Sequence, residues 1–182
     1  MIVMKRLFLL VAAVTLSSCG GGSDQATGSP PAGDTADPGV LSRYTASYPL
    51  VDNSDAAAYK VLLMGNSHAS GLYPVLADLM ALGQPDKRID VQLSSRGGFL
   101  ADRVNDGFSH HDLESEPWTH VILQGQKYST TGSYSYPTDA AEYWIRGSKQ
   151  QGATPIMFPE HPRRDNSWEG RTLWELHSGI AA

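Results

Sequence analysis

A serine stands where a predicted buried strand gives way to a helix. The segment 65–68 (Gly-Asn-Ser-His) follows the apolar run 59–64 and precedes a helical pattern over 72–82. At such a point the helix dipole and free backbone N–H groups favour negative charge on a bound oxygen. Ser67 is therefore a candidate nucleophile for attack on a carbonyl carbon. The alternative is a structural helix cap, because Ser and Asn66 are both favoured N-cap types.

Two further polar segments follow predicted strands. Segment 94–98 (Ser-Ser-Arg-Gly-Gly) comes after the strand 89–93, and segment 124–126 (Gln-Gly-Gln) comes after the strand 120–123. Glycines let backbone approach a ligand closely, and uncharged amides are suited to an oxyanion hole. A plain turn and a polar loop are the respective alternatives. Because ligands bind beyond the carboxyl ends of parallel strands, the three segments together predict one shared pocket.

The elements that must position these residues alternate along the chain. Short apolar runs predict strands, and a 3.6-residue apolar period predicts helices. The predicted strands are 59–64, 89–93, 120–123 and 154–158. The predicted helices are 72–82, 99–108, 138–151 and 168–180. Such alternation indicates βαβ units and hence an α/β fold with a parallel sheet. The 182 residues suit one domain, which we place at 46–182.

The segment 65–68 resembles the first block of the SGNH, or GDSL-like, hydrolase superfamily, with Asn66 in place of the usual Asp. Gly98 resembles the glycine of the second block, and the run Val-Ile-Leu-Gln-Gly-Gln resembles the third, with Gln126 in place of the oxyanion Asn. The resemblance covers about residues 59 to 160. It implies a three-layer, flavodoxin-like sheet and a serine esterase or deacetylase without a cofactor. The implied nucleophile is Ser67, and the implied substrate is a small-molecule or carbohydrate ester.

The fourth block of that superfamily, Asp-x-x-His, has no counterpart in this sequence. The resemblance therefore implies four strands here, with the last strand and the last helix lacking and the domain C-terminally incomplete. An alternative base is His161, in the loop after the strand 154–158, with Glu160 or Asp165 nearby. Without a base, the competing hypothesis is a non-catalytic envelope binding lipoprotein, or an inactive truncated fragment of such a hydrolase.

Two features near the predicted site suggest a substrate surface. The loop 128–136 carries three tyrosines among serines and threonines, which suits stacking on a sugar, although a solvated loop explains it as well. Arg163 and Arg164 offer positive charge for an anionic group, with simple solvation as the alternative.

The first 18 residues have the form of a signal peptide. Lys5 and Arg6 precede the ten-residue apolar run 7–16, which is too short to span a bilayer. Leu-Ser-Ser-Cys then resembles a bacterial lipobox, in which Cys19 becomes lipid-modified after cleavage. An ordinary signal peptide with a chance cysteine is the alternative.

A Gly-, Ser- and Pro-rich stretch follows Cys19 and predicts a flexible tether over 19–45. The expected protein is therefore a cell-envelope lipoprotein, held to the membrane through Cys19. By resemblance to known sorting rules, Gly20 favours the outer membrane, facing the periplasm or the surface.

Charge and cysteine content exclude several classes of protein. Fourteen basic residues against 19 acidic ones give a net charge of −5, which argues against nucleic acid as a partner. One cysteine excludes a disulfide framework. The His, Asp and Glu residues show no metal-ligand spacing, so we expect no metal.

Overall fold

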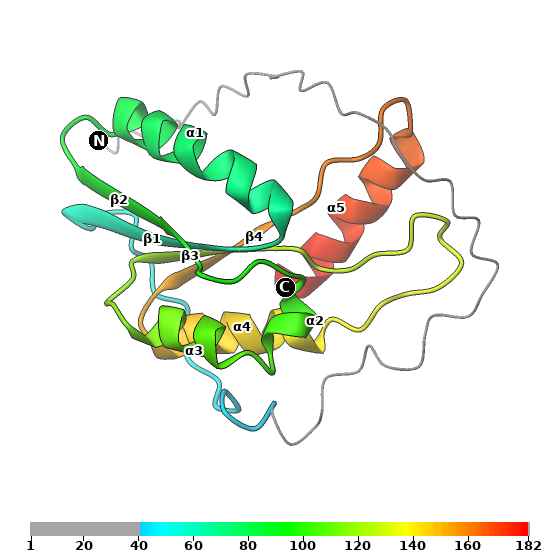
Figure 1. Ribbon diagram of the computed structural model, residues 1–182, viewed down its shortest axis with the longest axis horizontal. Helices are drawn as coiled ribbons and strands as arrows, with labels where there is room; N and C mark the ends of the chain where they lie inside the picture. The colour runs from blue at the N-terminus through cyan, green and yellow to red at the C-terminus, as the bar shows by residue number, and fades with distance from the viewer. Residues whose placement is uncertain (1–40, 182) are drawn as a thin grey trace, which may run out of the picture. The chain divides into compact units, whose positions relative to one another are not determined.

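The computed structural model describes residues 41–181, and within them the chain forms an open parallel sheet (Figure 1). Its strands are β1 (Ala58–Met64), β2 (Arg88–Leu93), β3 (His120–Gln124) and β4 (Thr154–Phe158), in the order β2-β1-β3-β4. Every pair is parallel, with Leu63 opposite Leu93 on one side and Ile122 on the other. The predicted α/β class with four parallel strands is confirmed, and the strand order is compatible with a flavodoxin-like fold.

Helices cover both faces of this sheet. They are α1 (Ser67–Gly83), α2 (Leu100–Arg103), α3 (Gly107–Glu114), α4 (Asp139–Gln150) and α5 (Ser167–Ala181). Figure 1 shows α1 on one side of the sheet and α2, α3 and α4 on the other. Helix α5 follows β4 and contacts it.

The side chains of β1 alternate between two hydrophobic clusters, as the two-residue period of a strand requires. Val61 and Leu63 pack toward α1, while Leu62 and Met64 pack into the larger cluster around Trp144 of α4. Full burial of such a side chain contributes about 1.5–3 kcal/mol. The two clusters therefore fix the carboxyl end of β1, from which Ser67 follows.

The packed domain begins before the predicted boundary at residue 46. Tyr44 is buried in the larger cluster, its ring lies against Gly147, and its hydroxyl donates to Glu114 at 2.7 Å. Arg146 Nε also donates to the Tyr44 carbonyl at 2.8 Å. The end of the predicted tether therefore belongs to the core. The predicted signal peptide and Cys19 lie outside the described residues.

Two helix boundaries differ from the sequence prediction. Helix α1 begins at Ser67 instead of residue 72, because the Asn66 side chain caps it by accepting from His68 N at 2.9 Å. The predicted helix 99–108 is two short helices, because Asp106 starts a new one by accepting from Phe108 N at 3.0 Å. Within residues 41–181, no helix combines the length and the apolarity needed to cross a bilayer.

Candidate active site

Ser67 is the first residue of α1 and is exposed at the carboxyl edge of the sheet. Asn66 is the N-cap, so Ser67 contributes one of the backbone N–H groups that a helix leaves unpaired. Within residues 41–181, neither this N–H nor the Ser67 hydroxyl has a hydrogen-bond partner. Among these residues nothing hydrogen-bonds the hydroxyl, and a free backbone donor at the positive end of the helix lies on the same residue.

The carboxylate of Glu160 ties three strand ends together at this edge. Its Oε1 accepts from Asn66 Nδ2 at 2.9 Å and from the Gln124 side-chain amide, and its Oε2 lies 2.5 Å from His68 Nδ1. Gln124 Oε1 in turn accepts from Asn66 N at 2.9 Å. The Glu160 side chain is only 9% exposed, so these donors replace the water it loses. The segment after β1 and Gln124 at the end of β3 are therefore in contact at this edge.

The His68 ring extends from this carboxylate into solvent. Its side chain is 58% exposed, and within the described residues its Nε2 has no hydrogen-bond partner. The ring stacks on that of His161, with centroids 5.5 Å apart and planes inclined by 27°. A carboxylate only accepts hydrogen bonds, so the neutral ring beside it carries its proton on Nδ1.

His161, the base proposed from the sequence, lies beside His68 and has no carboxylate partner among the described residues. Its Nδ1 is 3.4 Å from the Pro162 carbonyl oxygen. Glu160 bonds to His68 instead, and Asp165 lies 3.8 Å from Arg164. The structure therefore brings His161 to the site without orienting it.

The two oxyanion donors proposed from the resemblance are engaged in internal contacts. Gly98 N donates to the Gly65 carbonyl at 3.1 Å, with a φ of 157° at Gly98. Gln126 is buried, and its Nε2 donates to the carbonyls of Pro137 at 2.9 Å and Lys127 at 3.1 Å. In this arrangement the Ser67 N–H is the donor left for an anionic oxygen.

A buried arginine, which the sequence did not single out, shapes the loops after β1 and β2. The Arg103 guanidinium donates to the carbonyls of Gly65 at 2.6 Å and Gly98 at 3.4 Å, and also to that of Arg96. Burial lowers the pKa of Arg103, and two nearby aspartates oppose this change. The single guanidinium of Arg103 therefore holds the backbone of both the loop after β1 and the loop after β2. An arginine in a predicted helix is normally an exposed charge, so the sequence contains no signal that predicts the burial of Arg103.

His177 of α5 is 6% exposed, and neither ring nitrogen has a hydrogen-bond partner within the described residues. Burial lowers its pKa, and the nearby charge of Glu160 acts in the opposite direction. A second histidine thus lies in the electrostatic range of the Glu160 carboxylate.

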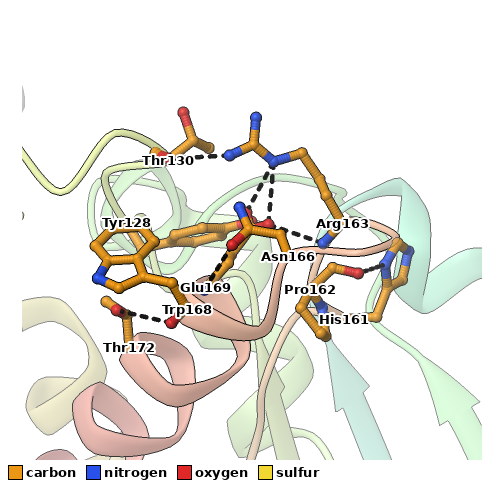
Figure 2. Close-up of polar contacts among 9 residues, drawn as sticks. All are labelled: Tyr128, Thr130, His161, Pro162, Arg163, Asn166, Trp168, Glu169 and Thr172. Atoms are coloured by element: carbon orange, nitrogen blue, oxygen red, sulfur yellow. Dashed lines mark hydrogen bonds and ion pairs between the residues drawn. The ribbon is translucent and has the colours of Figure 1, made fainter.

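A second carboxylate, Glu169, ties the loop 128–136 to the loop that precedes α5 (Figure 2). It accepts from Tyr128 Oη at 2.9 Å, from Arg163 N at 2.8 Å and from Arg163 Nε at 3.0 Å. Arg163 Nη2 also reaches the Thr130 carbonyl at 2.9 Å, and Asn166 Oδ1 accepts from Glu169 N at 3.0 Å. Arg163, proposed from the sequence for an anionic ligand, is therefore committed to this internal network.

The network shifts the ionisation of its members. Burial raises the pKa of Tyr128 to about 12, with the adjacent Glu169 as a second cause. Burial also raises the pKa of Glu169, but the hydrogen bonds from Arg163 and Tyr128 outweigh it and leave that pKa below its usual value. Glu169 is therefore a structural anion at neutral pH.

No group of three His, Cys, Asp or Glu side chains within residues 41–181 is arranged to hold a metal ion. No protein-family model, curated protein or solved structure matches the chain. A function for this chain is therefore inferred from its α/β class and from the residues at the carboxyl edge of the sheet.

Sequence reasoning placed Ser67 at this edge but missed the partners of its neighbour. His68 and Glu160 lie 92 residues apart, so no local pattern joins them. Each residue of the pair nevertheless has a signal in the sequence. His68 directly follows the predicted nucleophile, and Glu160 follows the end of a predicted strand.

Proposed function

We propose that the chain is a lipid-anchored serine hydrolase of SGNH type, an esterase or deacetylase that acts on a carboxylic ester of a small molecule or carbohydrate. One observation carries this proposal. The unpaired, exposed hydroxyl of Ser67 lies at the start of α1, at the carboxyl edge of a parallel sheet, next to a histidine–carboxylate pair. Ligands of open parallel sheets bind beyond the carboxyl ends of the strands. The backbone N–H groups at a helix start there can stabilise the oxyanion that forms in acyl transfer.

The proposed reaction follows from the groups at this edge. Ser67 Oγ attacks the ester carbonyl carbon, and the resulting tetrahedral oxyanion lies against the Ser67 N–H and the positive end of α1. Collapse expels the alcohol and leaves an acyl group on Ser67, which water then releases as the acid. A single well-placed donor to such an oxyanion contributes about 10²–10³ in rate.

A second candidate is a non-catalytic binding protein of the cell envelope. It is favoured by the contacts of Gly98 N–H and of the Gln126 amide, both of which donate to backbone carbonyls in this structure. A binding protein needs no oxyanion donors and no activated serine.

Labelling with a fluorophosphonate probe separates the two candidates. We expect the probe to modify wild-type protein and Ser70→Ala, because Ser70 is an exposed serine one turn further along α1. Ser67→Ala should lose the label and the hydrolysis of p-nitrophenyl acetate. Absence of labelling in both proteins would support the binding protein, whereas equal labelling of wild type and Ser67→Ala would exclude Ser67 as the nucleophile.

A further inference from the structure

The pair formed by His68 and Glu160 has an arrangement that a general base requires. We propose that His68, oriented by Glu160, takes the proton from the Ser67 hydroxyl, and that Asn66 and Gln124 act as positioning residues for Glu160. This inference rests on the proposed function and identifies the base for its reaction.

The hydrogen bond to Glu160 fixes which ring nitrogen can accept a proton. Glu160 Oε2 lies 2.5 Å from His68 Nδ1, and a carboxylate accepts the Nδ1–H. The lone pair of the neutral ring is then on Nε2, which no described residue contacts by a hydrogen bond. The side chain is 58% exposed, so the ring is largely open to solvent.

The carboxylate is itself held in one orientation. Asn66 and Gln124 both donate to Oε1, which leaves Oε2 for the imidazole. Asn66 also caps α1, so the residue that starts the helix of the nucleophile also orients the partner of the base. Few rotamers of Glu160 satisfy these donors together, and such fixed geometry is what positioning for proton transfer requires.

Ser67 and His68 are the first two residues of α1, and adjacent helical side chains point about 100° apart. Both side chains are exposed, and because neighbouring helical positions do not face each other, the proton of Ser67 reaches His68 through one bridging water. His161 stacks on the His68 ring but is bonded to no carboxylate among the described residues. His68 is therefore the better oriented base.

The proton balance of the reaction is complete with these groups. As Ser67 Oγ bonds to the carbonyl carbon, its proton moves to His68 Nε2, and Glu160 stabilises the resulting imidazolium. When the carbon–oxygen bond to the alcohol breaks, that proton passes to the leaving oxygen. A water molecule repeats the sequence on the acyl–serine ester, which restores the Ser67 hydroxyl and the neutral ring.

The sharpest test replaces Glu160 by Gln. The Gln oxygen can still accept from Asn66 and Gln124, but its NH₂ group then faces His68 Nδ1 and donates to it. The proton of the neutral ring moves to Nε2, which can no longer accept one. We expect kcat to fall by about 10⁴-fold with KM little changed, as in a triad whose base has the wrong tautomer.

Long-range ¹H–¹⁵N NMR of the His68 ring supplies a readout that does not depend on turnover. Wild type should carry the ring proton on Nδ1, and Glu160→Gln should carry it on Nε2. A wild-type ring protonated on Nε2 would overturn the inference whatever the activity.

His68→Gln tests the base at an exposed position, and His111→Gln, an exposed histidine on α3, is the matched control. We expect His68→Gln to lose Ser67-dependent turnover by at least about 10³-fold while His111→Gln retains it. Turnover that survives His68→Gln and is abolished by His161→Gln would assign the base to His161 instead. Absence of Ser67-dependent labelling and turnover in wild type would refute the proposed function itself, and this inference with it.

Discussion

Two carboxylates that follow β4 in the chain, Glu160 and Glu169, are stabilised in different ways. Glu160 is surrounded by neutral amides and one imidazole, whereas Glu169 accepts from the charged guanidinium of Arg163. A carboxylate paired with a permanent cation is a fixed anion. One bonded to an imidazole can respond when that ring gains a proton. The difference between their partners makes Glu169 a structural anion and is consistent with the role proposed for Glu160.

His177 carries a pH prediction. Burial lowers its pKa below the ordinary value of 6.5, with Glu160 opposing, so the unfolded chain takes up this proton at a higher pH than the folded one. Its contribution to stability is complete above about pH 6.5 and is lost as pH falls toward the folded pKa. We expect urea denaturation to show the free energy of unfolding falling below pH 6.5, by at most about 1.4 kcal/mol per pH unit for one proton.

His177→Phe should make that decline shallower and raise stability at pH 7.5, because it also removes two buried nitrogens that have no partner within the described residues. Burial lowers the pKa of His110 and His120 as well, so part of the slope should remain. An identical slope in wild type and His177→Phe would contradict the assignment.

The position of a residue could be predicted from the sequence where its contacts are with residues close to it in the chain. The position of Ser67 was predictable because it follows from the strand and helix that flank the residue. The amide of Gln126 was not, because its partner Pro137 lies 11 residues further on, across a loop with no periodic pattern. The pairing of Glu160 with His68 was likewise not predictable, because it depends on the packing of β4 beside β3.

At the scale of elements, the loop 128–136 is fixed to the start of α5. Besides the Glu169 network, the Trp168 ring packs directly over Gly132, whose φ is 70°. An added Cβ at Gly132 would lie 2.5 Å from the Trp168 ring. Glycine is therefore required there for two reasons, the left-handed backbone and the approach of an indole.

Gly152 provides a matched control for this contact. Its φ is 74°, but an added Cβ there meets nothing within 4 Å. Gly152→Ala should therefore cost only the left-handed backbone, about 1–2 kcal/mol. Gly132→Ala should cost more, and it should raise hydrogen exchange across 128–136, because Trp168 must move. Equal losses of stability, measured by urea denaturation, would show that the Trp168 contact contributes nothing.

The elements themselves were largely predictable, because buried parallel strands are short continuous apolar runs. All four predicted strands are present, within one residue at each end. The errors lie at helix starts. Gly71 and Pro74 are weak helix formers, yet the Asn66 cap and the packing of Ala69, Leu76 and Met80 on the sheet outweigh them.

At the scale of the whole molecule, the sequence predicts a lipid anchor at Cys19, before a domain in whose core Tyr44 is buried. The mature chain from Cys19 onward would carry 12 basic and 19 acidic residues, a net charge of −7. Such a chain is not attracted to an anionic membrane surface by its charge. Stable membrane association therefore depends on the acyl chains that the lipobox predicts.

Cys19→Ala should consequently move the protein from the membrane fraction to the soluble or secreted fraction of a bacterial host. The reason is quantitative, since one acyl chain gives only marginal binding and several on one cysteine give a stable anchor. Metabolic labelling with an alkyne fatty acid, followed by fractionation, should show the label on wild type and on the control Ser23→Ala, but not on Cys19→Ala. Wild-type protein that is soluble and unlabelled would exclude the lipoprotein, while leaving the chemistry proposed for Ser67 and His68 to be judged by its own assays.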